Sequence, residues 1–244
     1  MEACILEQNT VTLESLSSGF GVSMNTIRRD VNELLKRGRV RKIYGGVAAV
    51  RTEEMVPSER RQVINMTAKE EIGHLAAEFV KDGDVVFLDS GTTVPCVIPH
   101  LAEKKEITIL TYSLAAMNEA AKYPSLKLIS LGGYYNRQTD SFFGLSGADG
   151  LGGISIDIVL IAATGVSVSN GLTNSSYFET EMKKQAVSSG GKTVLMADAS
   201  KFGKAALRSF CSIQDLYGIA TDKKPEKKYL DIIKENGILL KYRS

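Results

Sequence analysis

Six short, almost wholly apolar segments recur between positions 85 and 221, and helix-like stretches separate most of them. The segments are residues 85–89, 107–111, 126–131, 156–162, 192–197 and 216–221. Near-continuous apolar runs that alternate with helices are typical of strands in a parallel sheet whose two faces are both covered. The alternation therefore predicts an α/β domain with a mostly parallel sheet.

The first of these segments runs into a turn of small, polar residues, in the sequence VVFLDSGTTV (85–94). The residues of the turn are Asp89, Ser90, Gly91, Thr92 and Thr93. A turn of this kind that opens a helix offers hydroxyls and backbone N–H groups to an anion such as a phosphate. The alternative is that a hydroxyl only caps the helix, and the turn alone does not decide between the two.

Other strand ends carry residues of similar chemistry. Ser113 follows the second segment, Gly132 and Arg137 follow the third, and Lys183 and Lys201 come later. Ligands bind at the carboxyl ends of strands in such a sheet, and an arginine fork suits a phosphate or carboxylate. Each lysine alone is more often a solvated surface charge. Their convergence at one edge predicts an anion-binding site.

Two helical patterns separated by a glycine-containing turn occupy residues 12–36. In the first, Thr12 is placed to cap a helix that buries Leu13 and Leu16, and Gly19 and Gly21 bracket the turn. In the second, Ser23 is the expected N-cap. Its apolar stripe is Ile27, Val31, Leu34 and Leu35, and the opposite face carries Asn25, Arg29, Asn32 and Lys36, with Thr26 and Arg28 on the flanks.

Residues 23–42 hold seven Lys or Arg against two acids, which suggests a polyanion partner. Gly38 is expected to end the second helix, and RVRKIYGG then alternates and turns, as in a small β-wing. This pattern favours a winged helix-turn-helix over a helix with a solvated charged face. The expected DNA contacts are Ser23, Asn25, Thr26, Arg28, Arg29, Lys36, Arg39 and Lys42, with Arg41 also in the wing.

The stretch VSMNTIRRDVNELLKRGRVRKIYGGV resembles the signature of the DeoR-type bacterial transcription regulators. That resemblance implies that Thr26, Arg28 and Arg29 contact DNA from a recognition helix. We expect a winged helix-turn-helix domain at 1–50, a polar linker at 51–65 and a sugar-phosphate effector-binding domain at 66–244. Family members have a longer first helix than the roughly two turns at residues 2–8 here.

The larger domain resembles the effector domain of the same family in DSGTT, LTYSL, GLTNSSYFETEMKK and ADASKFGK. That domain is similar to ribose-5-phosphate isomerase and the CoA-transferase fold group. The resemblance implies an effector site of Asp89, Ser90, Gly91, Thr92, Thr93, Ser113, Gly132, Arg137, Lys183 and Lys201. AATG (162–165) and GLTNS (171–175) are most like the repressors of inositol catabolism, whose inducer is a phosphorylated keto-deoxy sugar acid.

A sugar-phosphate isomerase that uses the same pocket is the alternative function. It requires a carboxylate as general base. The loop after the fourth segment has Thr164 where related sequences often have an acid, Asp157 precedes the strand, and Glu181 could project inward. The DNA-binding pattern favours a repressor without enzymatic activity, released from its operator by a phosphorylated sugar.

The remaining composition narrows the class of protein further. Cys4, Cys96 and Cys211 form no CxxC pair, and we expect His74 and His100 to be structural, so no metal site or cofactor is predicted. No segment has the length and hydropathy of a membrane span or a secretory signal, which predicts a cytoplasmic protein. The expected partners are double-stranded operator DNA, a phosphorylated sugar or sugar acid, and further copies of the chain in a homodimer or homotetramer.

Overall fold

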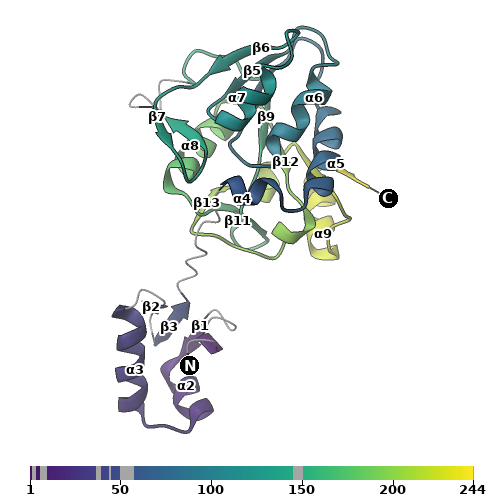
Figure 1. Cartoon of the computed structure of the whole chain (residues 1–244). Coiled ribbons are helices and arrows are strands. Elements are labelled where there is room, and N and C mark those ends of the chain that lie inside the picture. The colour runs from purple at the N-terminus through teal and green to yellow at the C-terminus, as the bar shows by residue number, and fades with distance from the viewer. Residues whose placement is uncertain are drawn as a thin grey trace. The chain divides into compact units, whose positions relative to one another are not determined.

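The computed structural model of the chain describes residues 1, 4–5, 10–36, 40–43, 45–49, 58–144 and 151–243, with the backbone alone at positions 10, 36, 41, 48, 49 and 59. The chain divides into two compact units, Met1–Met55 and Val56–Ser244. This division falls inside the predicted linker. Figure 1 labels the helices and strands of both units.

In its described residues, the smaller unit contains a three-stranded antiparallel sheet, helices α2 and α3, and helical residues Cys4 and Ile5. Its elements are β1 (Thr10–Thr12), α2 (Leu13–Phe20), α3 (Met24–Lys36), β2 (Val40–Ile43) and β3 (Gly46–Ala49), in the strand order β1-β3-β2. Thr12 Oγ1 accepts a hydrogen bond from the Ser15 N–H and caps α2, and Gly21, with φ of 63°, ends that helix. The core consists of Ile5, Val11, Leu16, Ile27, Val31, Leu34, Val40 and Val47.

The predicted helix-turn-helix and wing are confirmed by α2, α3 and the β2–β3 hairpin. Strand β1 was not predicted, because three residues are too few to establish an alternating pattern. Gly19 lies within α2 rather than in the turn, so that part of the prediction was wrong. The expected first helix falls mostly outside the described residues, as do Gly38 and Arg39; Cys4 and Ile5 are helical.

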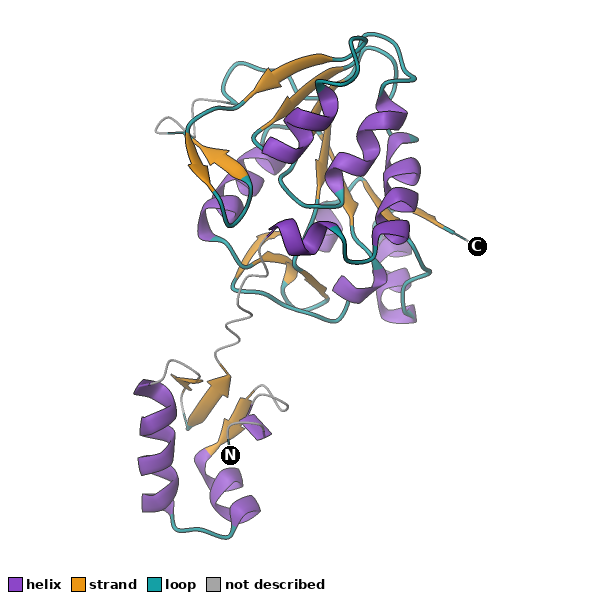
Figure 2. Ribbon diagram, in the orientation of Figure 1, coloured by secondary structure: helices purple, strands orange, loops and turns teal. Residues whose placement is uncertain are grey.

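The larger unit is built on a seven-stranded parallel sheet (Figure 2). Its strands are β4 (Val85–Leu88), β5 (Thr108–Thr111), β6 (Lys127–Ser130), β9 (Ile158–Ile161), β12 (Lys192–Met196), β14 (Gly218–Thr221) and β15 (Leu239–Tyr242). They lie in the order β15-β14-β12-β9-β4-β5-β6. All six predicted strands are confirmed, and β15 is an addition. Leu88 pairs with Thr111 and Leu160, which brings the ends of β4, β5 and β9 level.

Helices cover both faces of this sheet. On one face lie α5 (Met66–Ala77), η1 (Val94–Val97), α6 (Ile98–Leu101) and α7 (Leu114–Ala120), and on the other lie α8 (Tyr177–Ser188) and α9 (Lys227–Glu235). Along β4 the side chains alternate between the two faces. Val86 and Leu88 lie in the core beneath α5, η1, α6 and α7, and Phe87 lies in the core beneath α8 and α9. The predicted α/β class is therefore confirmed.

Shorter strands lie beyond the main sheet. β7 (Tyr134–Asn136) and β8 (Ser141–Phe143) form a hairpin, and β10 (Gly165–Ser167), β11 (Gly171–Asn174) and β13 (Arg208–Cys211) form a three-stranded sheet. Two 3₁₀ turns, η2 (Ala199–Lys201) and η3 (Ile213–Asp215), complete the unit. These elements lie in the chain segments that follow the carboxyl ends of β6, β9 and β12.

Helix α4 (Ser58–Gln62) lies within the predicted linker, residues 51–65. The following helix, α5, begins at Met66, and its N-cap is Asn65, in the left-handed region with φ of 55°. Among the described residues, no helix has the length and hydropathy needed to cross a membrane.

Candidate functional site

Asp89, the first residue after β4, is the centre of a buried polar network. Its Oδ1 accepts a hydrogen bond from the Tyr112 hydroxyl at 2.6 Å, and its Oδ2 accepts one from the Ala162 N–H at 2.9 Å. Asp89 Oδ2 also forms an ion pair with Lys183, whose side chain is 2% exposed and also donates to the Ala162 carbonyl at 2.9 Å. The network thus joins the ends of β4, β5 and β9 to α8.

Ser90 extends the network to a second buried carboxylate. Its hydroxyl donates to Glu179 Oε1 at 2.7 Å and lies 3.0 Å from the Tyr112 hydroxyl. Glu179 Oε2 accepts from the Asn174 amide at 3.0 Å, and Asn174 Oδ1 accepts from the Thr164 hydroxyl at 2.8 Å. Both oxygens of this carboxylate are therefore occupied by protein donors.

The network fixes the protonation of its phenol. Burial raises the pKa of Tyr112 well above its usual range, and the carboxylates of Asp89 and Glu179 raise it further. The phenol therefore keeps its proton and donates to Asp89. Lys183 neutralises the charge of Asp89, whereas Glu179 accepts its hydrogen bonds from the neutral groups of Ser90 and Asn174.

The loop Asp89–Thr93 depends on a close contact at Gly91. A Cβ at position 91 would lie 2.3 Å from the Cβ of Ala162. Thr93 is buried, and Thr92 is half-buried. The expected helix after the loop begins as the 3₁₀ turn η1, and Pro95 and Pro99 remove N–H groups from η1 and α6. Fewer backbone donors are available here than the sequence suggested.

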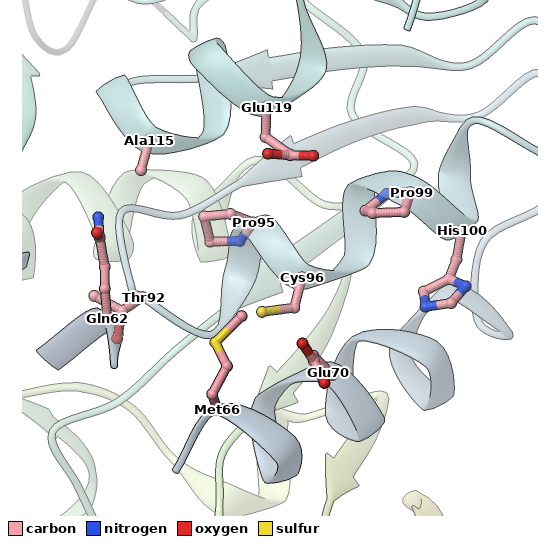
Figure 3. A pocket seen from close by; sticks show the side chains of 10 residues that line it. All are labelled: Gln62, Met66, Glu70, Thr92, Pro95, Cys96, Pro99, His100, Ala115 and Glu119. Atoms are coloured by element: carbon pink, nitrogen blue, oxygen red, sulfur yellow. The ribbon is translucent and has the colours of Figure 1, made fainter. Parts of the chain in front are cut away.

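A cavity of about 440 Å³ lies beside this loop (Figure 3). Its lining residues are Gln62, Met66, Glu70, Thr92, Pro95, Cys96, Pro99, His100, Ala115 and Glu119. The two carboxylates come from α5 and α7, and burial raises the pKa of the Cys96 thiol. A cavity lined by acids and apolar groups suits the neutral part of a ligand better than its phosphate.

The other predicted effector residues lie around this edge. Ser113 is buried and caps α7 through its bond from the Ala116 N–H. Gly132 and Arg137 are exposed, on the segment that forms the β7–β8 hairpin. Lys201 is half-buried and ends η2. The structure joins Asp89 to Lys183 directly and to Ser90 through Tyr112, and it holds Ser113, Arg137 and Lys201 on separate segments.

The sequence analysis missed Lys69, a second buried lysine. Lys69 lies on α5, is 4% exposed, and donates to the carbonyl groups of Arg61 and Gln62, the latter at 3.3 Å. Burial lowers the pKa of Lys69, Lys201 and Arg61 lower it too, and Cys96 and Asp198 raise it. Its only signal in the sequence was its place on the apolar face of an amphipathic helix.

The carboxylate expected to project inward was misassigned. Glu181 is 40% exposed and pairs with Lys184 and Arg208 at 3.4 and 3.6 Å, whereas Glu179 is the buried acid. Asp157, the other acid considered, accepts a hydrogen bond from the Val85 N–H at 2.8 Å. These contacts assign Glu181 to the surface and Asp157 to the connection between two strands.

The predicted DNA-binding face of α3 is exposed. Asn25, Arg28 and Arg29 all face solvent, and the Arg29 side chain is 79% exposed. Ser23 Oγ accepts the Thr26 N–H at 3.2 Å and lies 3.0 Å from Thr26 Oγ1, so both residues build the cap. Lys42 is exposed on β2. The Lys36 side chain and the whole of Arg39 lie outside the described residues.

The two histidines lie together in the larger unit. The rings of His74 and His100 meet edge to face, with centroids 5.0 Å apart. In the part of the chain that the structure describes, no three His, Cys, Asp or Glu residues are grouped so that they could hold a metal ion.

Both units match models of one protein family. Residues 1–53 match the DeoR-like helix-turn-helix domain, and residues 64–223 match the DeoR C terminal sensor domain. The chain is 38% identical over 238 residues to the HTH-type transcriptional regulator IolR of Bacillus subtilis (strain 168), covering 98% of this chain and 95% of that protein. It is 26% identical over 236 residues to the glycerol-3-phosphate regulon repressor of Escherichia coli (strain K12), covering 97% and 94%.

Solved structures share the fold at low sequence identity. The eIF2B beta structure from Chaetomium thermophilum is similar with a TM-score of 0.50 and 14% identity, over 70% of this chain and 54% of that chain. Ribose 5-phosphate isomerase A from Methanocaldococcus jannaschii gives a TM-score of 0.43 and 21% identity, over 57% and 55%. The likeness to the eIF2B beta structure concerns the fold alone.

Proposed function

This chain belongs to the DeoR family of transcriptional regulators, and from this premise we propose that it represses a carbohydrate catabolic operon. A phosphorylated sugar intermediate, bound by the larger unit, releases it from its operator. The observation that supports the proposal is a compact unit with an exposed basic helix, α3, joined in one chain to a second unit with a buried polar network at the ends of β4, β5 and β9.

The exposed face of α3 supports DNA binding. Asn25, Arg28 and Arg29 have the amide and guanidinium groups that bind base edges and phosphates, and none of them takes part in the core. We propose that they contact operator DNA together with Ser23, Thr26, Lys36, Arg39 and Lys42. A homodimer or homotetramer held by the larger units would present paired recognition helices to operator half-sites.

The edge formed by the ends of β4, β5 and β9 supports effector binding. Its buried network holds the Asp89–Thr93 loop, and Ser113, Gly132, Arg137 and Lys201 lie on the segments around that loop. We propose that these residues, with Lys183 beneath them, bind the effector. Because AATG and GLTNS are most like the inositol-catabolism repressors, a phosphorylated keto-deoxy sugar acid is the effector to test first.

The hydrogen bonds of the buried carboxylates argue against an isomerase. Asp89 is paired with Lys183, and Glu179 accepts bonds from Ser90 and Asn174, so neither is free to remove a proton from a substrate. Thr164, at the position where an acid was sought, donates its hydroxyl to Asn174. Binding without turnover is the function that this chemistry favours.

The test is a gel shift with the DNA that flanks the chain's own gene, repeated with a panel of sugar phosphates that includes inositol-pathway intermediates. We expect a specific complex that one of these compounds dissolves. Arg29→Ala should lose the complex and keep effector binding, since it changes only the exposed face of α3. Turnover of any compound by the purified protein would support the isomerase instead.

A further inference from the structure

Helix α4 spans two parts of the proposed effector edge, and it is the first described element after residues 50–57. At one end, the Ser58 N–H donates to the carbonyl of Gln138, the residue next to Arg137, at 3.3 Å. At the other end, the carbonyls of Arg61 and Gln62 accept from Lys69. Figure 1 shows α4 between the β7–β8 hairpin and α5.

Lys69 is a buried cation whose partners are unusual. A buried ammonium is normally paired with a carboxylate, whereas within the described residues Lys69 has only carbonyl groups as hydrogen-bond partners. Lys201 and Arg61 lie close enough to act on it, and the nearby acid Asp198 accepts the Ser200 N–H at 2.9 Å. Lys69 and Lys201 are two cations beside the one acid Asp198, which suits an anionic ligand.

Ser58 is a second, independent sign of a missing partner. Its residue is 2% exposed, and its hydroxyl has no hydrogen-bond partner among the residues that the structure describes. Buried polar groups are almost always paired, so an unpaired hydroxyl beside a binding edge indicates a ligand atom. Ser58 and the Lys69 contacts lie at opposite ends of the same short helix, α4.

Resting on the proposed function, we propose that Lys69 and Ser58 also contact the effector's phosphate, and that Lys69 leaves the α4 carbonyls to do so. A phosphate oxygen is a stronger acceptor for an ammonium than an amide carbonyl. Helix α4 then loses the bonds at its C-terminal end when the site is filled. The first helix after the connector thereby responds directly to the effector.

The charged residues near the Asp89–Thr93 loop favour binding of the phosphate at Lys69 and Lys201. The cavity beside Thr92 carries Glu70 and Glu119, which repel a phosphate, whereas Lys69 and Lys201 attract it. The sugar part of the effector is then left facing the cavity. One ligand would thus occupy both features, with its charge at Lys69.

A single tryptophan provides a direct test, because the chain has none of its own. Arg60→Trp, at an exposed position of α4, gives a full-length protein whose fluorescence reports on that helix. Inorganic phosphate is titrated against chloride at matched ionic strength, and binding is also measured by calorimetry. We expect a saturable fluorescence change. Adding Lys69→Met should weaken phosphate binding roughly tenfold or more and abolish that change, since a charge-assisted bond is lost.

The matched control is Lys234→Met, an exposed lysine of α9, which should leave both readouts unchanged. Ser58→Ala should weaken phosphate binding about severalfold, as expected for one neutral hydrogen bond. Lys69→Met removes a buried charge and also the donor to the Arg61 and Gln62 carbonyls, so the folding of the variant is compared with that of the parent protein. Circular dichroism and the urea midpoint check this for every variant.

Wild-type affinity for phosphate in Lys69→Met, or no saturable phosphate binding by the parent protein, would overturn the inference. A parent protein that binds no operator but loses phosphate binding on Lys69→Met would remove the repressor function and keep this site. An operator complex that a sugar phosphate dissolves equally well in Lys69→Met would keep the function and remove the site.

Discussion

Gly91 shows how closely the loop after β4 packs against the end of β9. A Cβ at this position would lie 2.3 Å from the Cβ of Ala162, a separation that requires one of the two segments to move. We therefore expect Gly91→Ala to cost about 1–3 kcal/mol of unfolding free energy through overpacking. It should also weaken phosphate binding, because the loop hydroxyls are displaced. Urea denaturation and calorimetry measure the two effects.

Gly132→Ala is the matched control for that substitution. No atom lies within 4 Å of a Cβ at Gly132, and the residue is exposed. Its unfolding free energy should stay within about 0.5 kcal/mol of the wild type. Equal losses in the two variants would contradict the account of Gly91 as a close-contact residue.

The Asp89–Lys183 pair has a different consequence when one partner is removed. Lys183→Met leaves a fully buried carboxylate without its ammonium, and we expect a loss of about 3–5 kcal/mol in unfolding free energy. Lys184→Met removes a half-exposed partner of Glu181 and should cost less than about 1 kcal/mol. Comparing the urea midpoints of the two variants shows whether the loss in unfolding free energy requires a buried ion pair or follows from the loss of any paired lysine.

The double variant Asp89→Asn, Lys183→Met isolates the pair. It removes the stranded charge, so part of the stability lost in Lys183→Met should return. A double variant less stable than Lys183→Met would indicate that the Asp89 charge is held by its other donors, Tyr112 and Ala162.

At the residue scale, the sequence predicted the positions of the strand-end residues and the two faces of α3, but not the buried face of α8. Asp89, Ser90 and Ser113 follow apolar runs whose ends are easy to locate. On α8, however, residues 179 and 181 lie on different faces. Predicting which of the two acids is buried requires knowing where the helix begins. Ser176 caps α8 by accepting the Glu179 N–H. That S-x-x-E spacing was the available signal for placing Glu179 in the first turn.

At the scale of elements, the recognition helix depends on its N-cap. The Ser23 hydroxyl accepts the Thr26 N–H in the first turn of α3. We expect Ser23→Ala to destabilise α3 by about 1 kcal/mol, since the cap bond is lost. Faster hydrogen exchange of the α3 amides would show it, without interference from the larger unit.

Asn25→Ala provides the comparison within the same turn. Asn25 is exposed, and alanine is the better helix former, so exchange should stay the same or slow. If Asn25→Ala and Ser23→Ala speed exchange alike, the cap is not what stabilises the start of α3. Operator affinity is then compared between the two variants. Ser23 is proposed to bind DNA and also caps α3, whereas Asn25 is proposed to bind DNA and has no role in the cap.

The elements that the sequence did not predict lack an unbroken apolar run. Glycine or polar residues interrupt the strands of the hairpin β7–β8 and of the sheet β10-β11-β13, and the last strand, β15, has two leucines followed by Lys241 and Tyr242. They therefore lack the near-continuous apolar pattern that indicated the central strands. Helix α4 was missed for a similar reason: its five residues, SERRQ, have no apolar member.

At the scale of the whole molecule, the sequence predicted the two kinds of unit but not the contacts that join segments far apart in the chain. The level ends of β4, β5 and β9 depend on a strand order that periodicity does not encode. In the proposed function, release from the operator depends on coupling between the two units, which must be measured on the full-length protein.

The proposed function makes that coupling reciprocal. If an effector lowers operator affinity by some factor, operator DNA must lower effector affinity by the same factor. We expect a coupling free energy of about 1–3 kcal/mol, roughly a 5- to 150-fold change, with opposed binding. Four dissociation constants are required: operator with and without saturating effector, and effector with and without saturating operator, at one salt concentration.

Two variants test this set of four dissociation constants. Arg29→Ala should weaken operator binding and leave the effector constant of the free protein unchanged, because its guanidinium is exposed in the smaller unit. Lys69→Met should weaken effector binding to the free protein. If effector and operator instead bind with no mutual effect, the two units act independently, and release by a sugar phosphate is excluded as the mechanism.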